Sequence, residues 1–338
     1  MPKLSTVKIS DRPQKILVYG EPKSGKSELV GELAEMGYNL HWMDCENGAD
    51  VLFKLSQEAQ ERITLYSIRD NKVQRSAIRA AMTFADMLPF TVCHEHGEVN
   101  CSKCKASKAP VDSFDPSTLG PKDVVVWDSL SQISISSVAQ LTRKENLLDV
   151  DTVNYKDTTD FSLYNAQGKM LDAFGSAVQT APFKVVCISH VSEIEKKDNP
   201  RGKGVNPLMG TKNKSKTSSK FYSHVVYTYL KNNKHCVMSS TTKDMAITAG
   251  SRTDIDVSVE PRGLAALFEK VGVEQVAPTN AGEAKKTLVA AKSVVATEKT
   301  PSPAIKPEAF KELPSTPEAS VAPMTALQKM IAKQKNRA

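Results

Sequence analysis

Residues 20–27 read GEPKSGKS, and this octapeptide restricts the fold more than any other part of the chain. The apolar run KILVY precedes it at 15–19, and Leu29, Val30 and Leu33 follow it at helical spacing. A buried strand, a glycine loop and a helix in this order direct backbone N–H groups and a helix N-terminus at one anion. The pattern therefore predicts a P-loop, which binds the phosphates of a nucleoside triphosphate.

The loop residues divide into expected roles. We expect Lys26 to reach the β- and γ-phosphates of ATP, and Ser27 to bind Mg²⁺. The whole predicted phosphate-binding set is Gly20, Glu21, Pro22, Lys23, Ser24, Gly25, Lys26 and Ser27. The alternative is a chance match in a strand–turn–helix unit.

A second Mg²⁺-binding residue is predicted at Asp128, which ends the apolar run DVVVWD at 123–128. An aspartate at this end of a strand beside a P-loop can hold Mg²⁺ through water. The alternative is that Asp128 only caps the helix that follows.

Short apolar strands alternate with helical segments over most of the chain. Besides those named, strands are expected at 38–43, 63–68, 183–189, 221–230 and 234–240, and helices at 27–36, 73–88, 133–141, 162–180 and 263–271. This alternation is typical of an α/β fold with a mostly parallel sheet flanked by helices. We expect one P-loop core spanning 1–275.

Met43-Asp44-Cys45-Glu46 follows the second strand and resembles the strand-end acidic motif of RecA-like recombinases. The resemblance implies that Glu46 activates the attacking water. An exposed loop carboxylate is the alternative. Residues 187–190 (CISH) resemble the family's strand that ends in a γ-phosphate sensor, which implies that role for His190. A histidine that only anchors the loop is the alternative.

The segment KFYSHVV at 220–226 resembles the part of that family that re-enters the sheet after the DNA-binding loops. The match is closest to small phage-encoded RecA-like single-strand annealing ATPases, and it covers about residues 15–271. It implies ATP hydrolysis stimulated by single-stranded DNA.

A basic loop is expected from about Glu193 to Lys220, with the KNKSK stretch at 212–216 exposed. No acidic residue occurs from Asn199 to Lys243. Such a segment can follow a phosphate backbone and release its counterions. The candidate DNA-binding residues are Arg201, Lys203, Lys212, Lys214, Lys216 and Lys220. The alternative is a solvated loop without a ligand. Arg252, later in the core, is either a surface residue or an arginine that reaches a neighbouring subunit's nucleotide.

A separate insertion is expected at 93–120, where polar residues replace the apolar pattern. Its C-x2-H and C-x2-C pairs suggest a closed tetrahedral Zn²⁺ site made by Cys93, His96, Cys101 and Cys104. His94 competes with His96, but the spacing favours His96. The site would stabilise a segment that has no core of its own. Metal-free cysteines in a disordered insertion are the alternative.

From 276 the chain becomes rich in Ala, Pro, Thr, Ser, Lys and Glu, which predicts a disordered linker at 276–323. Residues 324–338 could form a short helix that docks on a single-strand-binding or replication protein, or could have no function. No apolar run is long enough to span a membrane, and the start lacks a signal peptide. We therefore expect a cytoplasmic protein, in the host cytoplasm if it is phage-encoded.

The combined hypothesis is an ATP-dependent protein that binds single-stranded DNA and promotes annealing or strand exchange as a ring or filament of identical subunits. Two other classes stay open. One is a different P-loop ATPase, such as a helicase or helicase loader. The other is a protein-binding module switched by nucleotide.

Overall fold

The computed structural model describes residues 13–72, 74–143, 161–194, 204–240, 246–252, 257–258, 263–264 and 267–268. Within them, the P-loop strand β1 (Lys15–Gly20) leads into helix α1 (Lys26–Glu35). The chain then forms β2 (Asn39–Asp44), the short 3-10 helix η3 (Ala49–Lys54), α2 (Gln57–Glu61), β3 (Ile63–Ser67) and α3 (Ser76–Ala85).

A small module follows, made of β4 (Phe90–Cys93), α4 (Ser102–Ser107), β5 (Val111–Phe114) and η4 (Pro116–Thr118). The chain returns to the sheet as β6 (Asp123–Asp128), α5 (Leu130–Arg143), α6 (Phe161–Thr180) and β7 (Lys184–Ser189). The remaining described elements are β8 (Val191–Ile194), β9 (Gly204–Pro207), α7 (Lys212–Thr217), η7 (Ser218–Phe221), β10 (His224–Lys231), β11 (Lys234–Met238), β12 (Ala246–Ile247) and β13 (Gly250–Ser251).

The central sheet has the strand order β11-β10-β1-β7-β6-β2-β3, with β13 also paired to β10. All neighbours from β10 to β3 are parallel, and β11 and β13 run antiparallel to β10. Parallel strands that alternate with helices confirm the expected α/β fold with a mostly parallel sheet flanked by helices. Because the strands are parallel, the carboxyl ends of β1, β2, β6 and β7 meet at one edge of the sheet.

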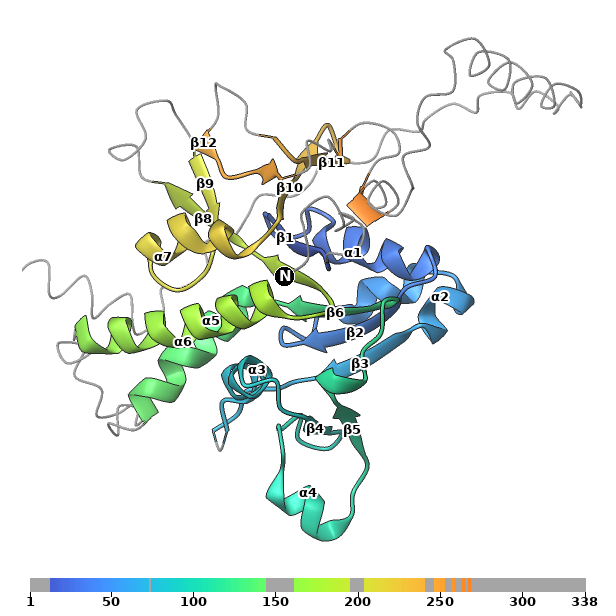
Figure 1. The fold of residues 1–338 in the computed structure, drawn as a ribbon, viewed down its shortest axis with the longest axis vertical. Helices are drawn as coiled ribbons and strands as arrows, with labels where there is room; N and C mark the ends of the chain where they lie inside the picture. Colours follow the sequence, from blue (N-terminus) through green and yellow to red (C-terminus); the bar gives the residue numbers. More distant parts are fainter. Residues whose placement is uncertain are drawn as a thin grey trace, which may run out of the picture. The chain divides into compact units, whose positions relative to one another are not determined.

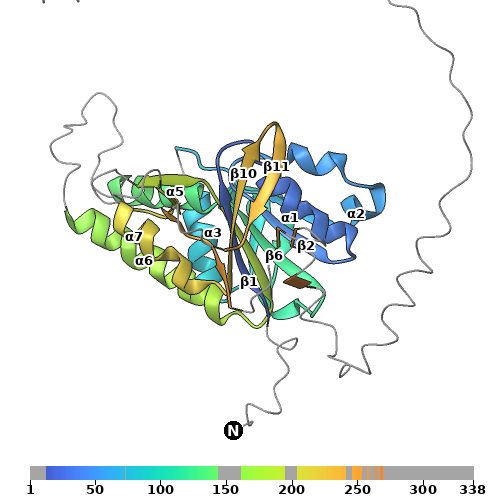
Figure 2. The ribbon, with the colours of Figure 1, turned by 90° about the horizontal axis from the view of Figure 1, so that it is seen from above.

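Helices cover both faces of this sheet (Figures 1 and 2). Helices α1 and α2 lie on one face, and α3, α5, α6 and α7 lie on the other. Each face has its own apolar core, because side chains of a buried strand alternate between the two faces. Leu17, Val125 and Trp127 belong to the core under α3 and α6, whereas Val18 and Val126 belong to the core under α1.

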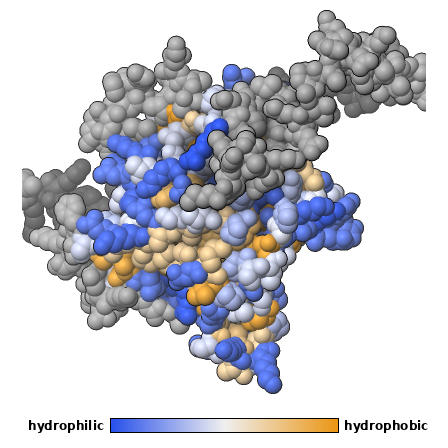
Figure 3. Space-filling model, viewed as in Figure 1, coloured by the Kyte–Doolittle hydropathy of each residue, from blue (hydrophilic) through white to orange (hydrophobic). Residues whose placement is uncertain are grey.

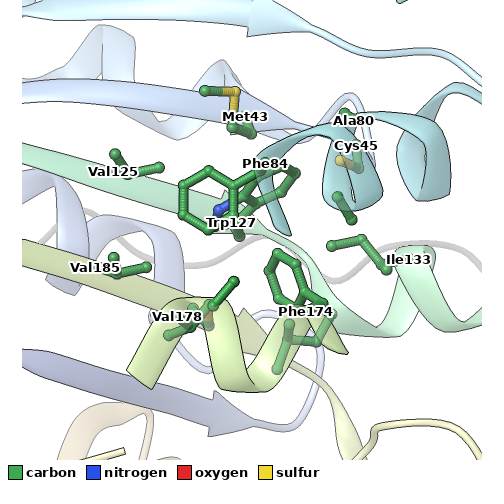
Figure 4. Packing of buried hydrophobic residues seen from close by; sticks show 14 of the residues in the cluster. Met43, Cys45, Ala80, Phe84, Val125, Trp127, Ile133, Phe174, Val178 and Val185 are labelled. Carbon is green, nitrogen blue, oxygen red and sulfur yellow. The ribbon is translucent and has the colours of Figure 1, made fainter. Parts of the chain in front are cut away.

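Trp127 is the centre of the larger core. Its ring is fully buried and packs edge-on against Phe84 of α3 and Phe174 of α6, with centroid distances of 5.3 and 5.2 Å. Figure 4 shows this layer of aromatic rings between the strands and the two helices. This packing fixes the end of β6, and with it the position of the next residue, Asp128.

The structure confirms the predicted strands, except that the one expected at 221–230 begins at His224, because Phe221 ends the 3-10 helix η7. The two expected helices at 133–141 and 162–180 appear as α5 and α6. Helix α3 is shorter than the predicted 73–88. Strands β10 and β11 form a hairpin, with Asn232 and Asn233 both at positive φ in its turn. Most of the helix expected at 263–271, and the whole tail from 276, lie outside the described residues. The core boundary at 275 stays a prediction.

The expected long basic loop is wrong for the described part of 193–220. Strands β8 and β9 pair antiparallel there, and the KNKSK stretch is helix α7 rather than an exposed loop. The side chain of Thr211 caps this helix by accepting a hydrogen bond from the N–H of Lys214, at 3.4 Å. The buried Ser215 ties it down further, because its Oγ accepts from the N–H of Met209. The KNKSK stretch is therefore a short helix whose buried side is held to the protein by Ser215.

No helix among the described residues has the length and apolar character needed to cross a membrane.

Candidate functional site

The loop between β1 and α1 has the conformation that a phosphate-binding loop needs. Lys23 and Gly25 have φ values of 63° and 86°, so the backbone turns sharply before α1 begins. The Nζ of Lys26 donates to the carbonyl oxygens of Gly20, at 3.2 Å, and Glu21, at 2.8 Å. Burial lowers the pKa of this amine, while the nearby carboxylates oppose the shift. The amine is therefore held over its own loop, where a phosphate can replace the two carbonyls as its partner.

Ser27 and Asp128 face each other across the sheet edge. The hydroxyl of Ser27 donates to Oδ2 of Asp128 at 2.9 Å. Asp128 is 4% exposed, and burial, with a further contribution from the charge of Glu46, raises its pKa to about 7. A hydroxyl and a buried carboxylate are the donors that Mg²⁺ takes at P-loops. This pair fits the expected metal.

Glu46 is positioned by a turn that Asp44 organises. Oδ1 of Asp44, a buried side chain, accepts hydrogen bonds from the N–H groups of Glu46 and Gly48 at 3.2 and 3.1 Å. The carboxylate of Glu46 accepts a hydrogen bond from the Ser129 hydroxyl and lies 3.0 Å from Nε2 of His190. Burial opposes ionisation, but these two hydrogen bonds outweigh it and lower the pKa of Glu46. Glu46 is thus an ionised carboxylate at the edge of the cleft, as a general base requires.

His190 follows β7 and connects this cleft to the segment beyond β9. Its N–H donates to the buried Ser131 hydroxyl at 2.9 Å, and its carbonyl accepts from the N–H of Leu208 at 2.8 Å. The Ser189 hydroxyl also donates to the carbonyl of Leu208, at 2.9 Å. The backbone of His190 is therefore hydrogen-bonded to the segment that leads into α7.

These side chains line one cleft of about 400 Å³. The structure brings together Lys26, Ser27, Glu46, Asp128 and His190, all of them predicted from the sequence. It adds His235 of β11, which the sequence reasoning missed. No sequence signal could have found His235, because it is far from the P-loop along the chain and belongs to no motif.

The four predicted metal ligands also converge. Nδ1 of His96 lies 3.8 Å from the Sγ atoms of Cys93 and Cys101 and 3.3 Å from that of Cys104, and the four ligand atoms are mutually within 4.8 Å. Tetrahedral zinc with usual bond lengths places sulfur and nitrogen ligands about 3.6 Å apart. The cluster can therefore hold a zinc ion without rearrangement.

His94 is not one of the converging ligands, and the apolar residues at the base of the module pack elsewhere. His94 turns away from the cysteines, and its Nε2 lies 2.9 Å from Oδ2 of Asp112, so the choice of His96 agrees with the geometry. The expectation that this insertion has no core of its own agrees with the packing, because its apolar side chains join the main core. Phe90, Val99 and Phe114 belong to the main apolar core, because the β4–β5 hairpin carries aromatic residues at its base. Only the tip around the cysteines has a separate small cluster.

The candidate DNA-binding lysines gather on and after α7. Lys212, Lys216 and Lys220 are exposed, and Lys214 is half-buried. Lys214 forms a close ion pair with Asp172 of α6, and Lys220 lies 3.5 Å from the same carboxylate. Arg201 and Lys203 lie outside the described residues.

Arg252 lies far from this cleft in its own chain. It follows β13, whose Ser251 pairs with His224 at the start of β10, and that start pairs with Ile16 near the start of β1. The P-loop is at the other end of β1. Arg252 therefore does not serve its own chain's nucleotide, and its action on a neighbouring subunit stays a prediction.

Comparisons with known proteins agree with this geometry. Residues 12–253 match the model of a family described as AAA domain. No curated protein sequence matches significantly.

Two solved structures show weak similarity to this chain. One is a prototypical ATPase from the type III secretion system of pathogenic bacteria, with a TM-score of 0.35 and 11% identity over 64% of this chain and 52% of the other. The chain thus spans about half the length of that ATPase. The other is the RadB recombinase, with a TM-score of 0.34 and 16% identity over 68% of this chain and 81% of the other.

The region matched by the family model holds the P-loop, Glu46, Asp128 and His190, and it makes up more than half of the chain. The protein therefore belongs to this AAA-domain family of P-loop ATPases.

Proposed function

We propose that this protein hydrolyses ATP, binds single-stranded DNA and promotes strand annealing or strand exchange. The observation that carries the ATPase part is the convergence of Lys26, the Ser27–Asp128 pair and the Glu46–His190 pair in one cleft. All of these groups lie near the shared carboxyl edge of four parallel strands, which supports the proposed roles.

In this proposal the P-loop amides and Lys26 bind the phosphates of ATP. Ser27 and Asp128 hold Mg²⁺, which supplies positive charge against the phosphate oxygens when it is bound. Glu46 accepts a proton from the attacking water. The hydroxyl of Ser129 and the ring of His190 keep its carboxylate ionised and oriented. The position of His190 suits a contact with the γ-phosphate, which would compete with Glu46 for the same ring nitrogen.

The link between nucleotide and DNA is proposed to run through the backbone of His190. A movement of His190 toward the γ-phosphate would displace Leu208, because the N–H of Leu208 donates to the carbonyl of His190 and its carbonyl accepts from the Ser189 hydroxyl. Leu208 leads through Gly210 into α7, and the N–H of Gly210 donates to Ser134 of α5 at 2.9 Å. The segment that carries the lysines is therefore anchored by two hydrogen bonds to the end of β7 beside the ATP site and by a third to α5.

The surface beside α7 supports single-stranded DNA as the ligand. A groove of about 730 Å³ lies between α6 and α7, and Tyr164, 44% exposed, stands at its side. Lys169 and Lys214 also line it, and Asp172 is the one acidic residue in its lining among the described residues. Hydrophilic side chains cover this part of the molecule (Figure 3). Lysines bind a phosphate backbone, and an exposed aromatic ring offers a surface on which a base can stack.

The remaining parts of the proposal rest on the sequence. Subunits would assemble as a ring or filament, the segment 324–338 would bind a single-strand-binding or replication protein, and the protein would act in the cytoplasm. The four-residue cluster would bind structural zinc, because three thiolates and one imidazole leave no open position for a substrate.

The test is steady-state ATP hydrolysis with and without single-stranded DNA, for the wild type, Lys26→Ala and Glu46→Gln. We expect DNA to raise the rate severalfold in the wild type. Lys26→Ala should lose ATP binding, whereas Glu46→Gln should bind ATP normally and lose hydrolysis by at least a hundredfold. A rate indifferent to DNA would refute the DNA part and favour a nucleotide-switched protein-binding module. Strand separation in place of annealing would favour a helicase.

A further inference from the structure

The β10–β11 hairpin packs directly against the P-loop. Gly20, the last residue of β1, pairs with Thr228, and β10 continues beyond it to Lys231 before the chain turns back as β11. The Thr228 hydroxyl lies 2.7 Å from the Ser24 hydroxyl. A Cβ at Gly20 would lie 2.3 Å from the carbonyl oxygen of Thr228, so only glycine allows this approach. The hairpin therefore keeps a fixed position relative to the phosphate-binding loop.

His235 is the residue of this hairpin that reaches the loop. It pairs with Leu230 in the ladder, and its ring lies against Gly25, where an added Cβ would be 2.8 Å from Nδ1. The side chain is exposed to the cleft that Lys26 and Asp128 line. Nδ1 of His235 thus lies beside Gly25, the residue that caps the start of α1.

The positions of the other residues in the cleft indicate which part of the nucleotide His235 contacts. Glu46 and His190 mark the end where the γ-phosphate reacts. P-loop amides around Gly25 cradle the α- and β-phosphates. Imidazole N–H groups donate to phosphate oxygens, and more strongly when the ring is protonated.

The geometry points to His235 as a nucleotide-binding residue that donates a hydrogen bond to the α- or β-phosphate from the β10–β11 hairpin. This inference rests on the proposed nucleotide site and adds a contact that no motif contains. His235 binds the part of the nucleotide common to ATP and ADP, so its contribution persists after hydrolysis. His190 in contrast meets only the triphosphate.

The experiment measures dissociation constants of a fluorescent ADP and of a non-hydrolysable ATP analogue for the wild type, His235→Ala and His235→Gln. Lys234→Ala is the matched control, because this neighbouring residue is exposed on the same hairpin and alternates to the other face of β11. Loss of one hydrogen bond to a phosphate predicts about a tenfold weaker affinity in His235→Ala for both nucleotides. His235→Gln, which keeps an N–H donor, should recover most of it. Lys234→Ala should stay within about twofold of the wild type, the range of neutral surface substitutions.

Two results would overturn the inference while leaving the proposed function intact. One is an ADP affinity unchanged in His235→Ala, whether or not the ATP analogue binds more weakly. The other is tighter binding, which would mean that the ring blocks the site. Failure of His235→Gln to recover affinity, together with a lower unfolding temperature of the nucleotide-free variants, would assign His235 a structural role and also overturn it. If the wild type binds neither nucleotide, the proposed function fails with it.

Discussion

We expect Asp128→Asn to stabilise the nucleotide-free protein at pH 8. Asp128 is buried, and burial together with the charge of Glu46 raises its pKa from 3.8 to about 7. Between these two values the folded protein holds a proton that the unfolded chain has lost. The free energy of unfolding therefore falls as the pH rises through this window. The ionised carboxylate thus costs stability that Mg²⁺ and nucleotide would restore.

The magnitude follows from the same pKa. One pKa unit corresponds to about 1.36 kcal/mol, so the wild type should lose about 2 kcal/mol between pH 5.5 and pH 7 through this residue alone. An asparagine cannot ionise, and its amide oxygen can still accept the hydrogen bond from Ser27. The advantage of Asp128→Asn should therefore grow by about 2 kcal/mol over this range and then level off.

The assay is urea unfolding at pH 5.5, 6.5, 7.5 and 8.5 in the presence of EDTA, followed by circular dichroism. Asp123→Asn is the matched control at the other end of β6. Burial would raise the pKa of Asp123, but hydrogen bonds from Gly120 and Asn39 lower it instead. This variant should be less stable than the wild type by an amount that stays constant at pH 6.5 and above, where His41, 3.6 Å from Asp123 and with a pKa lowered by burial, is mostly neutral. A gap between Asp128→Asn and the wild type that does not change with pH would refute the reasoning.

Three further predictions concern the other groups. His190→Ala should slow ATP hydrolysis at least tenfold with little change in ADP affinity, measured by steady-state rates and by ADP titration; a matching loss of ADP affinity would contradict its assignment to the γ-phosphate. The purified protein should carry one zinc per chain by elemental analysis, lost in Cys104→Ser and retained in Cys236→Ser, and a metal content unaffected by Cys104→Ser would exclude this cluster. Gly175→Ala should destabilise by about 1–3 kcal/mol in urea, because its Cβ would lie 2.4 Å from the Phe221 ring, whereas Gly48→Ala, with open space around it, should be neutral.

The sequence determined the chemistry of the site and the class of fold. The P-loop, Asp128 and Glu46 each follow an apolar run, and the carboxyl ends of parallel strands meet at one edge. Local pattern predicted the P-loop and Asp128, and the resemblance to RecA-like recombinases implied Glu46 beside them. The zinc ligands were predictable for a similar reason, since metal geometry requires close pairs and the sequence spaces them accordingly.

Other features came only from the tertiary structure. His235 reaches the P-loop because β10 pairs with β1 and the chain then folds back, a register that depends on packing across the whole sheet. The ion pairs of Asp172 with Lys214 and Lys220 join α6 to the segment after β9 in the same way. Segment composition also misjudged α7, because a short polar helix anchored by one buried serine has no apolar periodicity to reveal it. A sequence motif identifies residues that are close in the chain. The contacts of His235 and Asp172 form only when distant segments pack together, so no motif contains them.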